Sequence, residues 1–308
     1  LAVLTSTQLA GLTSAQLRAL DSADLPGLST QALSGLGSAQ LAGLSSVQLG
    51  ALGSEQWQSL SSTQLRGLST EQIAGMATDD LGTLTSTQLT ALTTAQIVAL
   101  TTAQFASLDS SDIEALATAQ IRAMETRDVA ALDSQDFVAM SSAQVAALTT
   151  AQLRAIETAD LAHLSTAGVA AIASASIAAL GTRQLGALDS DQWQALTSTQ
   201  LRGLSTQQIA NLATDDLGSL TSNQLAAFTT TQLEALTTAQ IASLDSTDIG
   251  AFTTAQLRSL STRDIVALDS SDFAGLSTAQ VASLGTDQLR AMETQDVAAL
   301  TTDGLVAI

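Results

Sequence analysis

The sequence is short of most residue types that carry chemistry. Its 308 residues include no Cys, no Tyr and no Lys, and only one His (His163) and one Pro (Pro26). Without Cys the chain cannot form disulfides, thiolate metal sites or the Cys-x-x-Cys-His attachment of haem. A catalytic triad needs a base that is held by partners, and a solitary His does not supply one. A Gly-rich phosphate loop is missing as well. We therefore expect neither an enzyme nor a cofactor.

Positive charge and long apolar runs are also scarce. Ten basic residues face 29 acidic ones, which gives a formal net charge of −19. A surface that binds nucleic acid needs clustered Lys and Arg, so this composition argues against nucleic acid as a partner. Because no apolar run approaches 18 residues, we expect no membrane span. A signal peptide is not visible and the first residue is Leu1, so we expect the sequence to be an excerpt of a longer protein.

What the sequence does contain is one short repeat. From Thr5 onward it divides into 38 octads without an insertion or deletion, and we label their positions a to h. Position b is Ser or Thr in every copy, and position d is Gln in 23 copies and Asp in 11. Positions e and h are always large and apolar. Position g is Gly, Ala or Ser except at Thr83, His163 and Asn211. The chain is therefore expected to be a single continuous octad-repeat solenoid over residues 1–308.

A second period of 136 residues, or 17 octads, lies above the first. Trp57 and Trp193 have this spacing, and so do the pairs Asp79-Asp80 and Asp215-Asp216. Residues 53–188 form one complete long copy, with partial copies at 1–52 and 189–308. Duplication of a 17-octad block explains this pattern.

The octad favours short helices over other structures. In one continuous helix the apolar pair would rotate by about 80° at every repeat, because each residue advances the helix by about 100°. In a strand, e and h would face opposite sides of the sheet. The segment from a to d resembles a capping box, in which a hydroxyl and the residue three positions later satisfy free N–H groups. We predict an all-α superhelix with one helix of about four to seven residues per octad, and keep a β-solenoid as the alternative.

Each octad position then receives an expected role. Positions e and h should form the core, and c and f should face solvent or a partner chain. Small residues at g should allow close backbone approach, with His163 and Asn211 at places where the local spacing is wider or where g faces outward. We expect the hydroxyls at b to cap helices rather than to form an outer ice-binding array. Replacing Gln232, at d, should cost only a cap, about 1 kcal/mol.

The motif Leu-Thr-Thr-Ala-Gln-Ile/Leu-x-Ala-Leu, at Leu100–Leu108 and Leu236–Leu244, resembles the octad arrays of very large bacterial secreted and surface proteins. Such proteins are often described as adhesins or haem-utilisation proteins. The resemblance covers the whole chain. It implies an exported, extended scaffold or filament, and it carries no functional residue across.

The remaining chemical candidate is calcium. Two carboxylates three residues apart, in Asp-Ser-x-Asp, could hold Ca²⁺ if a neighbouring turn added oxygens. Asp is also a strong N-cap, and we favour that role. Trp57 and Trp193 are expected in the core, and His163 is expected to have no ligand. The calcium candidates are Asp21, Asp24, Asp109, Asp112, Asp133, Asp136, Asp245, Asp248, Asp269 and Asp272.

Together these observations favour a structural protein. We expect an extracellular or cell-surface filament or fibre formed by self-association. The alternative is an adhesin stalk or matrix-binding module that engages glycans or calcium through exposed positions a, c and f.

Overall fold

The computed structural model describes residues 3–308, and within that range it contains helices and no β-strand. Each octad from Thr5 forms one helix of four to six residues, so the all-α prediction is confirmed and the β-solenoid alternative is not supported. Contacts between residues divide the chain into two compact units, a first unit up to Ile156 and a second unit from Glu157.

The first unit consists of α-helices and one 3₁₀-helix, η1, which contains Pro26. Its helices are α1 (Ser6–Ala10), α2 (Ser14–Arg18), η1 (Ser22–Gly27), α3 (Thr30–Leu33), α4 (Ser38–Ala42), α5 (Ser46–Leu49), α6 (Ser54–Ser59), α7 (Ser62–Arg66), α8 (Thr70–Ala74), α9 (Thr78–Leu81), α10 (Ser86–Ala91), α11 (Thr94–Ala99), α12 (Thr102–Phe105), α13 (Ser110–Ala115), α14 (Thr118–Ala123), α15 (Thr126–Val129), α16 (Ser134–Ala139), α17 (Ser142–Ala147) and α18 (Thr150–Ala155).

The second unit repeats the same design with α-helices only. Its helices are α19 (Thr158–Leu161), α20 (Thr166–Ala171), α21 (Ser174–Ile177), α22 (Thr182–Leu185), α23 (Ser190–Ala195), α24 (Ser198–Gly203), α25 (Thr206–Ala210), α26 (Thr214–Gly218), α27 (Ser222–Leu225), α28 (Thr230–Glu234), α29 (Thr238–Ile241), α30 (Ser246–Gly250), α31 (Thr254–Ser259), α32 (Thr262–Ala267), α33 (Ser270–Ala274), α34 (Thr278–Ala282), α35 (Thr286–Ala291), α36 (Thr294–Ala299) and α37 (Thr302–Ala307).

The ends of each helix follow from the octad. In α11 the N-cap is Thr93, at position a, with an extended backbone; its side chain accepts the N–H of Gln96. The helix ends at Leu100, at position h, where ψ becomes 141° and the chain turns. Because the residue after each h is the next N-cap, the end of one helix places the start of the next. The predicted turn at h–a is confirmed.

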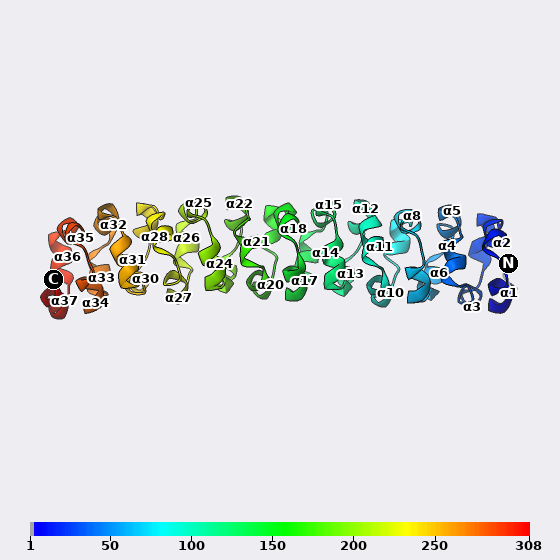
Figure 1. Ribbon diagram of the computed structural model, residues 1–308, viewed down its shortest axis with the longest axis horizontal. Helices are drawn as coiled ribbons and strands as arrows, with labels where there is room; N and C mark the ends of the chain where they lie inside the picture. The colour runs from blue at the N-terminus through cyan, green and yellow to red at the C-terminus, as the bar shows by residue number, and fades with distance from the viewer. Residues whose placement is uncertain (1–2) are drawn as a thin grey trace. The chain divides into compact units, whose positions relative to one another are not determined.

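Three octads complete one turn of the solenoid. In the first unit α7 packs on α10, α10 on α13 and α13 on α16, and in the second unit α27 packs on α30 and α30 on α33. Within each unit the short helices therefore follow one another around successive turns (Figure 1). Each helix is covered by the third helix before it and the third helix after it.

The core lies inside these turns and contains the side chains of e and h. Trp57, Trp193 and Phe105, all at position e, are fully buried, and nearly every other e and h residue is buried as well. Residues at a, c and f are mostly exposed, as Thr93, Ala95 and Val98 are in α11. The predicted assignment of e and h to a core, with c and f outside, is confirmed.

Position g brings successive turns into close contact. A Cβ placed on Gly67 would lie 2.3 Å from the Cβ of Ser38, at position b three octads earlier. A Cβ on Gly43 would lie 2.7 Å from that of Ser14 in the same arrangement. Small residues at g and b are therefore a packing requirement between turns. His163 and Asn211 are exposed, which agrees with the expectation that g faces outward there.

Candidate functional site: the polar contacts between turns

Position d holds the main polar contact of the molecule. In α11 the Oε1 atom of Gln96 accepts the N–H of Thr93 at 2.8 Å and the hydroxyl of Thr93 at 3.1 Å. Its Nε2 atom donates to the carbonyls of Leu65 and Leu68, at 2.8 and 2.9 Å. These carbonyls belong to positions e and h of the octad four copies earlier. One buried amide thus joins the start of one helix to the end of another.

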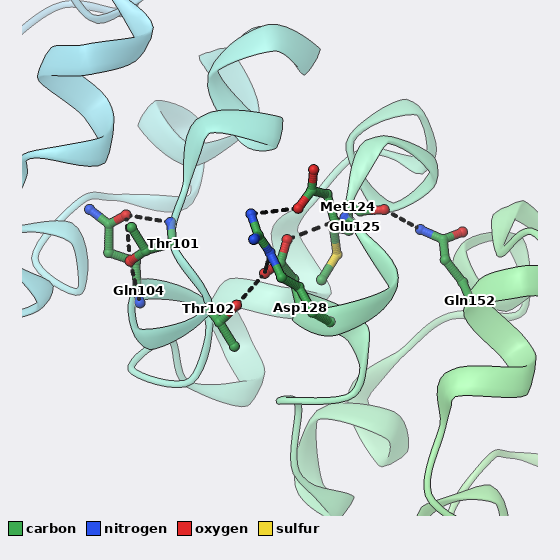
Figure 2. A network of polar contacts seen from close by, with 8 residues as sticks. Thr101, Thr102, Gln104, Met124, Glu125, Asp128 and Gln152 are labelled. Atoms are coloured by element: carbon green, nitrogen blue, oxygen red, sulfur yellow. Dashed lines mark hydrogen bonds and ion pairs between the residues drawn. The ribbon is translucent and has the colours of Figure 1, made fainter.

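The same contact recurs in both units, and we call its residue the bridging glutamine. Gln152 donates to Ile121 and to Met124, and Figure 2 shows the second of these bonds. In the second unit Gln232 donates to Leu201 and Leu204, both at 2.8 Å. A primary amide has two donors and one oxygen with two lone pairs, and this geometry uses all of them.

Sequence reasoning gave position d too small a role. We expected Gln232 to act as a cap alone, but its Nε2 atom also binds two carbonyls of α24 and its side chain is 3% exposed. The signal was present in the sequence. A capping box accepts Glu as readily as Gln, yet no octad has Glu at d. A glutamate can accept the N–H of the N-cap, but it has no hydrogen for the carbonyls.

The expected capping role of position b is wrong, because the N-cap is position a. In α7, for example, Ser61 accepts the N–H of Gln64, and Ser62 is the first helical residue. The hydroxyl at b has a different partner where Asp occupies d. Thr102 donates to Oδ1 of Asp128 at 2.8 Å, and Ser270 donates to Asp296 at 3.1 Å.

Figure 2 shows how Asp changes the contact between turns. Oδ2 of Asp128 accepts the N–H of Glu125 at 3.2 Å, and Oδ1 accepts the hydroxyl of Thr102 from the preceding turn. Arg127 pairs with Glu125 and lies 3.7 Å from Asp128. Burial raises the pKa of Asp128 in spite of these hydrogen bonds and the nearby guanidinium. Asp128 therefore binds a hydroxyl of the preceding turn instead of the carbonyls that glutamine binds.

The calcium candidates are found at helix starts. Asp109, Asp133, Asp245 and Asp269 are N-caps that accept the N–H of the residue three positions later. Asp21 caps η1 and accepts the N–H of Ala23, with Asp24 in the same first turn. The structure brings eight of the ten candidates together on two pairs of stacked helices. Asp109 and Asp112, at the start of α13, are electrostatic neighbours of Asp136 at the start of the packed helix α16. Asp245 and Asp248, at the start of α30, stand in the same relation to Asp272 at the start of α33.

These two groups, which we call the first and second aspartate clusters, each contain carboxyls whose pKa is shifted. Burial raises the pKa of Asp136 to about 6, with further contributions from Asp133, Asp109 and Asp112. Burial also raises the pKa of Asp272, which faces the corresponding neighbours. The N-cap Asp109 shows the opposite change, because the hydroxyl of Ser111 and the N–H of Asp112 lower its pKa. Over residues 3–308 no group of three or more acidic, His or Cys side chains is arranged to hold a metal ion. Calcium binding stays a prediction.

The other sequence candidates are structural. Trp57 and Trp193 lie in the core with their indole nitrogens buried and without a hydrogen-bond partner. Burial raises the pKa of Asp80, three octads after Trp57, and the Asp79 carboxylate adds to that rise. His163 lies on the surface. In the described part of the chain no helix is both long and apolar enough to cross a membrane.

The comparisons with known proteins agree with this repeat. The ALTTAQ repeat family matches the chain in tandem, and its matches together cover most of the chain. They fall at residues 18–54, 73–110, 105–136, 122–155, 129–166, 153–190, 169–198, 209–246, 241–271 and 265–302. No curated protein matches the sequence.

Proposed function

Because this chain belongs to the ALTTAQ repeat family, we propose that it is a non-catalytic structural protein that self-associates into an extracellular filament or surface fibre. The observation that carries the proposal is the recurrence of one contact set at successive turns. In both units, helices with a bridging glutamine are joined to an earlier helix, as Gln96 and Gln232 show. In a repeat of this kind a turn is stabilised by its neighbours, so lengthening the array adds stability without a new design.

The outer surface supports a structural role. Positions a, c and f present mostly small side chains, chiefly Ala, Ser and Thr, with a few amides and with scattered charges of mostly negative sign. Active sites usually depend on irregular loops that bring polar groups together, and the turns here are only a few residues long. The polar groups that are buried, at d, are occupied by contacts within the fold.

Outward valines offer the means of lateral contact, and besides Val3 and Val306 there are four of them. The exposed fraction is 70% for Val47, 43% for Val98, 53% for Val138 and 52% for Val266. On a surface of mostly small side chains, isolated apolar side chains of this size give association a modest driving force. The net charge of −19 opposes it, so salt should promote assembly.

Electron microscopy of the purified full chain at about 0.15 M salt tests the proposal. Filaments or bundles are expected for the wild type, and a variant with all four valines changed to Ser should form fewer or thinner ones. The control variant keeps the four valines and instead replaces the exposed Ala95 with Ser, which should leave assembly unchanged. Monomers that do not assemble but bind calcium or a glycan saturably would favour the alternative of a matrix-binding module.

A further inference from the structure

The aspartates at d leave a gap in the bridging pattern. At α33 the Oδ2 atom of Asp272 accepts the N–H of Asp269 at 2.9 Å, as a bridging glutamine would. As a carboxylate, however, Asp272 has no hydrogen to donate to the end of an earlier helix. Its neighbour across the turn, Asp248, has the same limitation. Asp272 therefore offers no amide to the carbonyls of Ile241 and Leu244, four octads earlier, and places a carboxylate that is only 5% exposed where α33 packs on α30.

No positive charge compensates these carboxylates locally. The helices packed on α33 are α30, with Asp245 and Asp248, and α36, with Glu293 and Asp296. Their octads, 245–252, 269–276 and 293–300, contain no Arg, Lys or His, and neither does the octad 221–228 under α30. Ser270 donates to Asp296, which gives that carboxylate one partner. Like charges that face each other at a buried contact destabilise it when all are ionised.

The first cluster has the same construction 136 residues earlier. Asp136 is 5% exposed, and the groups that face it are Asp133 on its own octad and Asp109 and Asp112 on α13. Glu114 lies on α13 as well, while the octad under α13, residues 85–92, is uncharged. Octads 109–116 and 133–140 contain no basic residue. Two independent turns of the solenoid thus have the same uncompensated carboxylates.

We propose that the two aspartate clusters are proton-operated contacts, which tighten the packing of α13 on α16 and of α30 on α33 as the pH falls from 7 to about 5. Burial and mutual repulsion favour the protonated form of Asp136 in the folded state, with a pKa of about 6 instead of 3.8. A group whose pKa is raised by folding adds stability as the pH falls through the folded value, and this gain is complete below the unfolded value.

The caps do not cancel the gain in this pH range. The pKa of Asp109 and that of Asp269 are lowered, chiefly by hydroxyl donors from Ser111 and Ser271. Their capping contribution is present above the unfolded pKa and is lost only as the pH falls through the lower folded pKa. Between pH 7 and 5 Asp109 and Asp269 stay ionised, while Asp136 takes up a proton.

Hydrogen exchange of the full chain at pH 5 and pH 7, corrected for intrinsic exchange rates, measures local opening directly. With a pKa of about 6 in the closed state, opening of α16 should be about tenfold rarer at pH 5 than at pH 7. Protection of α13, α30 and α33 should rise in the same direction. Helices α28 and α31, whose octads have bridging Gln232 and Gln256, should show little change. Equal protection of the clusters at both pH values would overturn the proposal.

The double variant Asp136→Asn and Asp272→Asn separates the clusters from a general effect of net charge. Asn has nearly the shape of a protonated Asp, so protection of the clusters at pH 7 should rise and lose most of its pH dependence. The matched control is Asp191→Asn with Asp287→Asn, which removes two negative charges at exposed sites. The control should keep the wild-type pH dependence. Loss of protection in the cluster variant, or the same gain in the control, would contradict the proposal.

Discussion

At the scale of the residue, the glutamine at d is the side chain on which most of the fold depends. Gln192 is 1% exposed and accepts the N–H of Asp189 at 3.0 Å. Its Nε2 atom donates to the carbonyl of Leu161 at 3.1 Å and to that of Leu164 at 2.7 Å. Asn could not span the same gap, because its side chain is one methylene shorter. This explains why Gln dominates the position.

Gln192→Ala should lower the free energy of unfolding by about 2–4 kcal/mol, since it leaves buried carbonyls and the N–H of the N-cap without their partner. Gln194→Ala is the matched control, because Gln194 lies two residues away on the exposed side of α23. It should change stability by less than about 0.5 kcal/mol. Urea unfolding followed by the fluorescence of Trp193 measures both variants. Equal effects of the two substitutions would show that the bridge contributes nothing.

Gly67→Ala tests the close approach at g. The new methyl group would lie 2.3 Å from the Cβ of Ser38, so the turns must move apart, at a cost of about 1–3 kcal/mol. Gly218→Ala is the control. Nothing lies within 4 Å of a Cβ there, and Ala favours the end of α26 more than Gly does. Thermal unfolding should show a lower midpoint for the first variant and an unchanged or higher one for the second. A Gly67→Ala protein as stable as the wild type would mean that the turns are not in close contact.

At the scale of the element, each helix is too short to persist alone and depends on the apolar residues at its end and middle. Leu236, at h, is 5% exposed. Leu236→Asp places an unpaired charge in the core and should cost more than about 4 kcal/mol, enough to unfold local turns. Val266→Asp at exposed position f of α32 should cost little. Circular dichroism and thermal unfolding compare the two, and an unchanged midpoint for Leu236→Asp would show that the assigned core face is wrong.

Much of the element design could be predicted from the sequence. The helix starts follow from Ser, Thr and Asp at a with Gln or Asp at d, and the core follows from the large apolar residues at e and h. These signals lie within one octad. The contacts of Gln96 with Leu65 and Leu68 span 31 and 28 residues, and nothing within an octad fixes how many octads make one turn. The proximity of Asp136 to Asp112 also depends on the number of octads per turn, so it could not be predicted from the sequence.

At the scale of the whole molecule, the repeat and its charge determine the expected behaviour. At three octads per turn, the 17-octad block corresponds to five turns and two further octads, so the duplicated block does not end where a turn ends. Residues that recur only once per block therefore do not return to the same side of the solenoid. Residues that every octad shares do return at each turn, and they are better suited to regular association. The net charge of −19 should keep dissolved chains apart at low salt and permit lateral contacts as salt screens it.

Sedimentation velocity of the purified full chain, over a hundredfold range of concentration at about 0.15 M salt, tests the central claim most directly. A self-associating structural protein should show sedimentation coefficients that rise with concentration, and the rise should weaken at about 10 mM salt, where repulsion between acidic surfaces extends further. A chain that sediments as a monomer at every concentration and salt level would contradict the account.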